Sequence, residues 1–509
     1  MLARTVMVQG TASSVGKSII ATALCRIFRN RGIRVAPFKS QNMALNSFVT
    51  PDGGEIGRAQ AVQAEAAGIE PSVEMNPILL KPERNLRAQV VMLGRPIGTL
   101  AFGEYHELGA RFRGAIARSL TSLRERYELI VIEGAGSPAE VNLKSRDIAN
   151  MYVAEAADAP VLLVGDIDRG GVFAQLVGTM ELLELKERAR VAALVVNKFR
   201  GERCLLDSGL DFLARRCGKP VLGVVPYIER LRIADEDSVA LEDRRARRLA
   251  EPAQLDIAVV RLPAISNYDD FLALEHEPDV VVRFVETAGE IEGADLVVIP
   301  GSKSTVADLE WLRCSGIAAA IESRAHRGEP VLGVCAGCQM LGESIEDPDG
   351  VESGAPVVAG LGLLALRTRF EPTKLTARVT ARVDAASFLT NGTVPEKELA
   401  GYEIHMGRME PSRIAAAPFR VASRNGARVV ARDGAISADG AVVGTMLHGI
   451  LEDDNLRGLL IRGLMKRKGL NGRESTGFPA AREAEYDRLA RTVSASLDLA
   501  MLDRIIGLA

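Results

Sequence analysis

Short apolar runs alternate with longer helical patterns along most of this sequence, and the alternation limits the folds open to the chain. Buried parallel strands read as nearly continuous apolar runs, and the helices between them cover both faces of the sheet. The first set of runs is Thr5–Val8, Arg34–Pro37, Leu129–Glu133, Pro160–Gly165, Ala192–Asn197 and Val221–Val225; the second is Asp256–Arg261, Asp295–Pro300, Pro330–Val334 and Val442–Met446. We therefore predict an α/β protein of two doubly wound domains with mainly parallel sheets.

A charged segment separates the two sets of runs. Residues 236–252 are rich in Asp, Glu and Arg and poor in large apolar side chains, a composition typical of a linker. We predict a first domain over residues 1–235, a second over residues 253–460, and a helical C-terminal tail over residues 461–509. The apolar residues of the tail that we expect to pack on a neighbour are Leu489, Val493, Leu497, Leu499 and Leu502.

The composition is that of an ordinary globular protein. The 509 residues are 47% hydrophobic and 25% charged, with a net charge of −3, which gives no reason to expect nucleic acid or an anionic membrane as a partner. We find no signal peptide at the start and no uncharged apolar run long enough to span a bilayer. The six cysteines form no regular framework. These features predict a cytoplasmic protein, and they leave open whether it forms a homo-oligomer.

A glycine-rich segment, residues 10–18, joins the first apolar run to a helical pattern and ends in glycine, lysine and serine. Backbone N–H groups of such a loop bind phosphate oxygens, while Lys17 would reach the terminal phosphates and Ser18 would ligate Mg²⁺. Gly10 lies one residue further from this ending than the common phosphate-loop pattern requires, so an ordinary glycine turn is the alternative. Asn197 ends another predicted strand, where its amide would read the base or cap the loop. The predicted ATP-binding residues are Gly10, Thr11, Ser14, Gly16, Lys17, Ser18 and Asn197.

Acidic residues stand at the ends of two further predicted strands. Glu133 ends one run, and Asp166 and Asp168 follow another, beside Arg169. Ligands of open α/β sheets bind outside the carboxyl ends of the strands, and Mg²⁺ takes one or two carboxylates together with phosphate oxygens. We predict that Ser18, Glu133 and Asp166 hold Mg²⁺, with a solvated loop charge as the alternative for each acid. No tightly bound prosthetic group is expected.

A cysteine follows the third apolar run of the second set. Pro330–Val334 leads into Cys335, and a helix-like segment follows, which is the strand–turn–helix order that exposes a nucleophile. Cys335 and Cys338 form a C-x-x-C pair, so a redox pair, half a zinc site and a buried thiol are the alternatives. Three glycines within residues 333–342 are unusual in a plain core helix. We interpret Cys335 as a nucleophile for carbonyl carbon and Cys338 as core packing.

A cysteine nucleophile needs a base and donors for the oxyanion. His448 follows an apolar run and stands at a strand end, with His405 as the second choice, whereas His326 lies in a charged helical pattern. The backbone N–H groups of Gly301 and Ala336 are the predicted oxyanion hole.

A phosphate-activating site joined to a thiol site indicates an amide ligase. ATP would phosphorylate a carboxylate, the thiol would release ammonia from an amide, and ammonia would attack the acyl phosphate.

Several motifs resemble those of known families. Residues 333–339 resemble the nucleophile turn of class I (triad) glutamine amidotransferases, and residues 10–18 are similar to the long-spaced phosphate loop of dethiobiotin synthetase. Both halves in this order resemble the cobyric acid synthase family of cobalamin biosynthesis. The other matching segments are residues 37–43, 55–61, 75–82, 133–138, 165–171 and 300–305.

The resemblance implies a P-loop NTPase-like first domain and a flavodoxin-like glutaminase as the second. It implies ATP- and glutamine-dependent amidation of the b, d, e and g side-chain carboxylates of a corrinoid, adenosylcobyrinic acid a,c-diamide. Motif matching makes Cys335 the nucleophile and His448 the base. The residues that would line the ATP or corrinoid site are Lys39, Gln41, Asn42, Asp168 and Arg169.

The sequence departs from the amidotransferase pattern near the base. Ordinary triad enzymes carry Glu two residues after the His, but here Ile450 takes that place, and Glu452 is nearby. This leaves open what orients His448, and a triad without its third member is one of the alternatives.

A second departure follows residues 197–201, where the family pattern predicts Asp and this sequence has Glu202. The nearest alternative function is that of cobyrinic acid a,c-diamide synthase. A further alternative is a partitioning-type ATPase without ligase activity, but such an ATPase would have no use for a nucleophilic Cys335.

Overall fold

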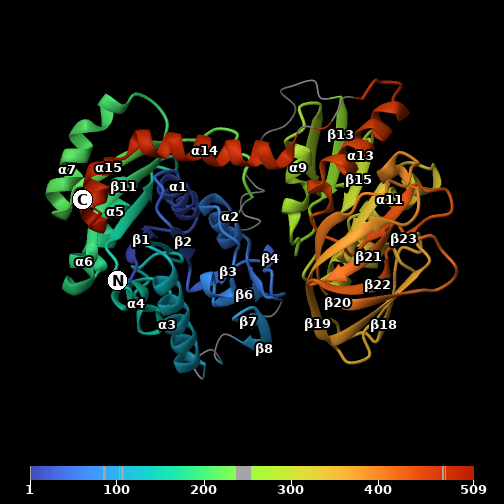
Figure 1. Ribbon diagram of the computed structural model, residues 1–509, viewed down its shortest axis with the longest axis horizontal. Helices are drawn as coiled ribbons and strands as arrows, with labels where there is room; N and C mark the ends of the chain where they lie inside the picture. Colours follow the sequence, from blue (N-terminus) through green and yellow to red (C-terminus); the bar gives the residue numbers. More distant parts are fainter. Residues whose placement is uncertain are drawn as a thin grey trace. The chain divides into compact units, whose positions relative to one another are not determined.

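The computed structural model describes residues 2–83, 87–101, 104, 108–234, 236, 254–472, 475 and 477–508 (Figure 1). Its contacts divide the chain into two units. Unit 1 is Met1–Ala44, Glu55–Ile233 and Arg482–Ala509, and unit 2 is Leu45–Gly54 and Ala234–Ala481. The predicted linker, residues 236–252, lies outside the described residues except for residue 236. No helix among the described residues is long and apolar enough to cross a membrane.

A six-stranded parallel sheet forms the centre of unit 1, in the order β12-β11-β10-β1-β9-β2. Its strands, in chain order, are β1 (Arg4–Gly10), β2 (Val35–Phe38), β9 (Leu129–Glu133), β10 (Val161–Asp166), β11 (Val191–Phe199) and β12 (Val221–Pro226). Every residue of β9 and β10 is buried, which explains why both read as continuous apolar runs. The sheet therefore matches the predicted strands and their parallel arrangement.

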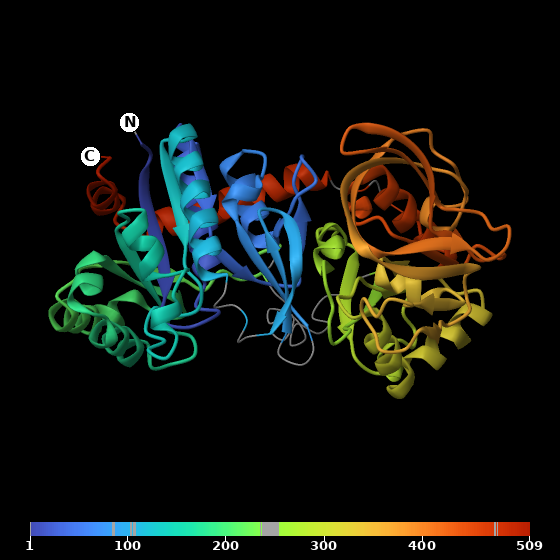
Figure 2. The ribbon, with the colours of Figure 1, turned by 90° about the horizontal axis from the view of Figure 1, so that it is seen from below.

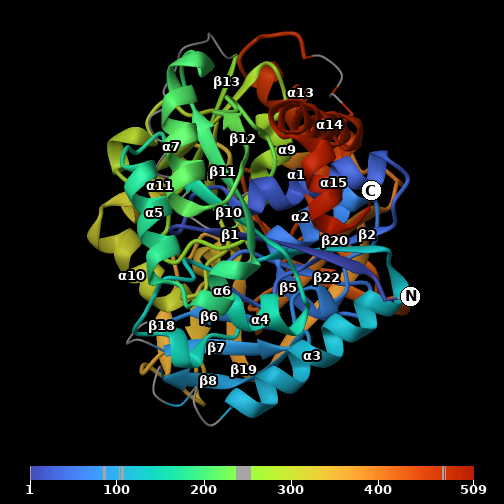
Figure 3. The same ribbon diagram turned by 90° about the vertical axis from the view of Figure 1, so that its left-hand side faces the viewer.

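Helices cover both faces of this sheet. The pair α1 (Lys17–Asn30) and α2 (Arg58–Ala67) and the pair α5 (Val172–Leu182) and α7 (Asp207–Cys217) lie on opposite sides of β1 and β10 (Figure 3). From β1 the later strands β10, β11 and β12 follow in order on one side, whereas β9 and β2 lie on the other, which places a topological switch point at the carboxyl end of β1. The remaining helices whose described parts belong wholly or mainly to unit 1 are α3 (Gly109–Arg126), α4 (Met151–Ala156), α6 (Leu185–Arg190), α14 (Phe478–Ser496) and α15 (Leu499–Ile506).

Unit 1 carries a second, smaller sheet that the sequence analysis did not predict. It has the order β3-β6-β7-β8, and β6-β7 and β7-β8 are antiparallel. Its strands are β3 (Gln41–Met43), β6 (Ile78–Pro82), β7 (Arg87–Met92) and β8 (Arg95–Ala101). Lys81 of β6 forms a buried ion pair with Glu55 of β5 (Glu55–Gly57), with a distance of 2.8 Å. Charged or polar residues occur within each of these short strands, so none of them reads as a continuous apolar run.

The main sheet of unit 2 has the order β14-β13-β15-β16-β24-β23. Its strands are β13 (Leu255–Val260), β14 (Val280–Val285), β15 (Leu296–Ile299), β16 (Val331–Val334), β23 (Ala435–Ile436) and β24 (Val442–Thr445). The first five in the sheet are parallel, and β23 is an antiparallel edge. Numbered along the chain, the five parallel strands follow the order 2-1-3-4-5 of flavodoxin-like folds. This confirms the predicted fold class.

A mainly antiparallel sheet, in which β17 and β19 pair in parallel, is inserted between β16 and β24. Its strands are β17 (Ser344–Glu346), β18 (Val357–Ala359), β19 (Leu366–Val383), β20 (Leu399–Pro411), β21 (Phe419–Arg424) and β22 (Ala427–Asp433). In Figure 2 these orange strands and the yellow helices α10 (Thr305–Cys314) and α11 (Ile317–His326) lie at opposite ends of unit 2. The other helices of this unit are α9 (Leu272–Glu275), α12 (Ala336–Leu341) and α13 (Asp454–Arg467). In a strand with one solvent-exposed face, polar and apolar side chains alternate along the sequence. This is why β19 shows no continuous apolar run.

Candidate active sites

Cys335 occupies the turn between β16 and α12. Its backbone has φ 52° and ψ −110°, a strained conformation for a residue that is not glycine, and its N–H donates to the Thr445 carbonyl at 2.7 Å. A Cβ on Gly337 would lie 1.9 Å from the Ile299 carbonyl oxygen, so only glycine lets α12 approach β15 this closely. The turn therefore holds the thiol at the carboxyl edge of the sheet, as a nucleophile turn does.

His448 follows β24 at the same edge and is 1% exposed. Its Nδ1 lies 2.7 Å from Asp270 Oδ2, and the other carboxylate oxygen accepts the N–H of Gly449 at 2.8 Å. Asp270 belongs to a short 3₁₀ helix, Tyr268–Phe271, which follows β13. The third residue of a triad, left unassigned by the sequence, is thus present in this geometry. Ile450, at the position where Glu was expected, is buried and apolar.

Asp270 was missed although the sequence holds a signal for it. Two adjacent acids, Asp269 and Asp270, follow the run that forms β13. Since β13 and β24 are parallel members of one sheet, their carboxyl ends lie at the same edge. A search for acids beyond every strand end of the second domain would have included Asp270.

The charges around His448 keep its ring protonated. Burial alone lowers the pKa of this imidazole, but the negative charges of Asp270 and of the Cys335 thiolate, together with hydrogen bonds to both, raise the pKa from the ordinary 6.5 to about 10. This places an acid–base group in contact with the Cys335 side chain. The three side chains can therefore act as a nucleophile, an acid–base group and an orienting carboxylate.

The two residues predicted for the oxyanion hole lie beside this triad. Gly301 follows β15, and a Cβ built on it would come 3.1 Å from His448 Cε1. Ala336 is the first residue of α12, so its N–H belongs to the group that lacks an acceptor within the helix. Their N–H groups remain the predicted donors.

The other histidines and the second cysteine have different surroundings. His405 Nδ1 lies 2.8 Å from the Gly407 carbonyl, and His326 is an exposed residue of α11. Cys338 is fully buried, its Sγ lies 3.4 Å from Met409 Sδ, and burial raises the pKa of this thiol well above its ordinary value. Cys338 is therefore a packed, unreactive thiol in this structure.

The phosphate loop of unit 1 joins β1 to α1. Gly16 has φ 97°, and a Cβ there would lie 2.2 Å from Asn197 Nδ2. That amide donates to the Val15 carbonyl at 2.9 Å, so Asn197 braces the loop from the end of β11. Thr11 N–H donates to the Val164 carbonyl at 2.9 Å, which ties the other end of the loop to β10. Lys17 Nζ donates to two backbone carbonyls, those of Ala12 and Gly136, each at 3.1 Å.

Ser18 and Glu133 come together as the sequence predicts. Ser18 Oγ donates to Glu133 Oε1 at 2.8 Å, at the carboxyl end of β9. Lys39 Nζ lies 2.8 Å from the same oxygen, and Gln63 Nε2 donates to the other oxygen at 2.5 Å. A hydroxyl and a carboxylate oxygen so close together fit the hard oxygen ligands of Mg²⁺. Gln63 is a neighbour of this carboxylate that the sequence analysis did not find.

Asp166 lies on the other side of β1 and has a different partner. Its Oδ2 is 2.8 Å from Lys198 Nζ, which also donates to the Ser14 carbonyl at 2.7 Å. Asp168 is exposed and forms a 2.8 Å ion pair with Arg200. Asp166 is therefore linked to the phosphate loop through a lysine, while its role as a metal ligand remains a prediction.

The segments predicted to line the substrate site are neighbours in unit 1. Asn42 Nδ2 donates to Gln60 Oε1 at 3.0 Å, and Asn76 Nδ2 donates to the Lys39 carbonyl at 3.0 Å. Gln41 lies half-buried on β3. Arg169 is exposed after β10.

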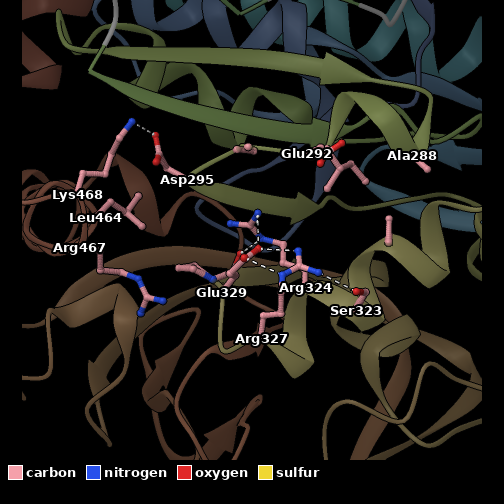
Figure 4. A pocket seen from close by; sticks show the side chains of 15 residues that line it. Ala288, Glu292, Asp295, Ser323, Arg324, Arg327, Glu329, Leu464, Arg467 and Lys468 are labelled. Atoms are coloured by element: carbon pink, nitrogen blue, oxygen red, sulfur yellow. Dashed lines mark hydrogen bonds and ion pairs between the residues drawn. The ribbon is translucent and has the colours of Figure 1, made fainter.

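A cavity of about 720 Å³ lies at the opposite edge of the unit 2 sheet (Figure 4). Asp295 and Pro330, in its lining, directly precede β15 and β16, whereas Cys335 and His448 follow carboxyl ends. Charged groups in its lining pair with one another, among them Lys468 with Asp295 at 3.0 Å. We assign it no part in the chemistry.

A strained thiol beside a carboxylate-held imidazolium, and a braced phosphate loop in another unit, define a class: a glutamine amidotransferase joined to a nucleotide-binding domain. Two family models match the chain accordingly. The CobB/CobQ-like glutamine amidotransferase domain matches residues 256–456, and the CobQ/CobB/MinD/ParA nucleotide binding domain matches residues 6–240.

Full-length relatives identify the family within this class. A protein named cobyric acid synthase from Sorangium cellulosum (strain So ce56) is 63% identical over 100% of this chain and 99% of its own length. Proteins of the same name from Moorella thermoacetica and Desulforamulus reducens are 50% and 46% identical over 100% of this chain, covering 98% and 99% of their lengths. The chain belongs to the cobyric acid synthase family. It is an amidotransferase ligase, which confirms the enzyme class expected from the sequence.

Proposed function

We propose that this chain uses ATP and glutamine to amidate the b, d, e and g side-chain carboxylates of adenosylcobyrinic acid a,c-diamide, giving adenosylcobyric acid. The name carried by the full-length relatives supports the corrinoid substrate. The chemistry rests mainly on one observation, the contact of the Asp270-bound His448 with Cys335.

In the glutaminase step, the Cys335 thiolate attacks the side-chain amide carbon of glutamine. His448 gives its proton to the departing ammonia, and the backbone N–H groups of Gly301 and Ala336 stabilise the oxyanion. Water, deprotonated by His448, then hydrolyses the thioester to glutamate and releases the Cys335 thiolate beside the reprotonated imidazole. Asp270 keeps the imidazole in one tautomer and orientation throughout.

In the synthetase step, a corrinoid carboxylate attacks the γ-phosphate of ATP and releases ADP. Lys17 and the N–H groups of the loop would hold the phosphates, and Ser18 and Glu133 would hold Mg²⁺, which neutralises phosphate charge when bound. Within the described residues no group of three or more His, Cys, Asp or Glu side chains could hold an ion alone, so phosphate oxygens would complete the coordination. Ammonia then displaces phosphate from the acyl phosphate and leaves the amide.

The test compares Cys335→Ala with Cys338→Ala in the intact chain. Cys335→Ala should abolish glutamine hydrolysis but keep amidation with free ammonia, whereas Cys338→Ala should retain both activities. Mass spectrometry of corrinoid products counts the amides added to adenosylcobyrinic acid a,c-diamide and to cobyrinic acid. Unchanged glutamine hydrolysis by Cys335→Ala would contradict the thiol mechanism. Amidation of cobyrinic acid but not of its a,c-diamide would favour the a,c-diamide synthase alternative.

A further inference from the structure

A ten-residue segment from the N-terminal part of the sequence belongs to unit 2. This segment, Leu45–Gly54, which we call the strap, contains β4 (Ser47–Val49). The residues before and after it, in β3 and β5, belong to unit 1. The strap lies outside the residues matched by the amidotransferase family model, residues 256–456. Its contacts nevertheless lead to the glutaminase centre.

A chain of buried hydrogen bonds joins the strap to Tyr402. Asn46 Oδ1 accepts the N–H of Asn267 at 2.8 Å, and Asn267 Oδ1 accepts the N–H of Ser47 at 3.2 Å. Asn267 Nδ2 then donates to the Tyr402 hydroxyl at 3.0 Å. Asn267 has φ 52°, a left-handed conformation that Asn tolerates better than most residues. The two bonds with the strap hold it in that conformation and aim its amide at the phenol.

Apolar contacts reach the same tyrosine from the strap. The ring centroids of Phe48 and Tyr402 are 5.9 Å apart, and Val49 forms a buried cluster with Tyr402 and Ile404. Arg378 fastens this end of the strap, since its Nε donates to the Val49 carbonyl at 3.0 Å. Tyr402 is therefore contacted along its ring by Phe48 and Val49 of the strap and at its hydroxyl by Asn267, which the strap in turn binds.

Tyr402 in turn contacts the base. Its ring stacks on the His448 imidazole with centroids 5.1 Å apart and an angle of 15° between the planes. The two backbones also exchange hydrogen bonds, from Tyr402 N–H to the His448 carbonyl at 3.1 Å and from His448 N–H to the Tyr402 carbonyl at 2.9 Å. Asp270 binds the imidazole at Nδ1, which leaves the ring able to tilt about that contact. The stacked Tyr402 ring restricts this tilt and so fixes the plane of the imidazole.

We propose that the strap is a positioning element of the glutaminase centre: Asn46 and Phe48 hold Tyr402, and Tyr402 holds His448 in register with Cys335. The inference rests on the proposed glutaminase role of Cys335 and His448. A general base works only when its ring is held within a few tenths of an ångström and about 10–20° of the productive geometry. The strap therefore makes a segment outside the amidotransferase match necessary for full glutamine hydrolysis.

The first experiment truncates the aromatic contact in the intact chain. Phe48→Ala should lower kcat for glutamine hydrolysis by about tenfold, because a misplacement of about 1 Å can cost up to about a hundredfold. KM for glutamine and ammonia-dependent amidation should stay within about twofold of the wild type. Phe48→Leu keeps an apolar contact and should restore most of the rate. Pro51→Ala, an exposed position in the same segment, is the matched control and should behave as the wild type.

The second experiment tests the hydrogen-bond chain without removing a large core side chain. Asn46→Ala and Tyr402→Phe interrupt the same path, so each should lower kcat by a similar factor and the double variant should be no slower than the slower single variant. The proposal is overturned if Phe48→Ala and Asn46→Ala both keep full glutaminase kcat, or if ammonia-dependent amidation falls in parallel. Cys335→Ala distinguishes a failure of the strap proposal from a failure of the proposed function. If this variant still hydrolyses glutamine, the proposed function itself fails.

Discussion

The carboxylate of Asp270 lies 2.7 Å from Nδ1 of His448, although 178 positions separate the two residues in the sequence. The position two residues after the histidine, where ordinary triad amidotransferases carry Glu, holds a buried isoleucine. An acid from the 3₁₀ helix after β13 therefore takes the position that the local motif does not fill. The same carboxylate also binds the N–H of Gly449, which fixes it from two directions.

We expect Asp270→Asn to slow glutamine hydrolysis by about 10²- to 10⁴-fold, because the amide neither stabilises the imidazolium nor selects the correct tautomer. Ammonia-dependent amidation should be unchanged. The matched control is Glu452→Gln, which changes the acid nearest to His448 in sequence and should stay within about threefold of the wild type. Steady-state glutaminase assays of both variants decide between these acids. The opposite ranking would assign the orienting role to Glu452.

His448 should titrate near pH 10, since the charges of Asp270 and Cys335 outweigh the effect of burial on its pKa. In Asp270→Asn the main raising charge is gone, so the pKa should fall markedly. NMR of histidine labelled at Cε1 can follow this, because the chain has only five histidines and His448→Gln assigns the signal. A wild-type His448 that titrates near 6.5 would contradict the ion pair.

The raised pKa of His448 also predicts how stability depends on pH. A group whose pKa is higher in the folded state stabilises that state fully below its unfolded pKa, about 6.5, and this stabilisation is lost as pH rises through about 10. The melting temperature of the wild type should therefore fall more steeply between about pH 7 and 10 than that of Asp270→Asn. Parallel curves for the two proteins would rule out this linkage.

The ion pair of Lys39 and Glu133 is almost fully buried, with side chains 4% and 0% exposed. Lys39→Met would leave the carboxylate without its cation, and we expect it to destabilise unit 1 by about 3 kcal/mol. Adding Glu133→Gln should recover part of that stability but not ATP-dependent amidation. The exposed pair Arg34 and Glu128 is the control, because Arg34→Met should change stability much less than Lys39→Met does. Urea unfolding followed by a probe in unit 1 measures both, and equal losses would contradict the role of burial.

Gly16→Ala should weaken nucleotide binding at least about tenfold, because the new Cβ would meet Asn197 Nδ2 at 2.2 Å in a backbone with positive φ. Glutamine hydrolysis without ATP should be unaffected. Gly178→Ala is the matched control: this glycine lies in α5 with open space at its Cβ, so alanine should be neutral or slightly stabilising. Calorimetric titration with ATP compares the variants, and an unaltered affinity in Gly16→Ala would remove this loop from the nucleotide site.

Most strands of the two parallel sheets could be predicted because burial on both faces leaves a continuous apolar run, as in β9 and β10. The meeting of Ser18 with Glu133 could also be predicted, since both follow neighbouring parallel strands whose carboxyl ends share an edge. The inserted, mainly antiparallel sheet could not be predicted, because strands with one solvent-exposed face, such as β19, mix polar and apolar residues.

The local chemistry of this protein can be read from its sequence, since a glycine-rich loop before a helix and a cysteine after a buried strand have only a few stable conformations. Contacts between segments that are distant in the sequence cannot be predicted in this way. That Asp270 rather than Glu452 binds His448, and that Asn46 reaches Asn267 from 221 positions away, depends on how loops pack once the sheets have formed. Side-chain periodicity records which face of an element is buried, and it carries no information about the partner that covers that face.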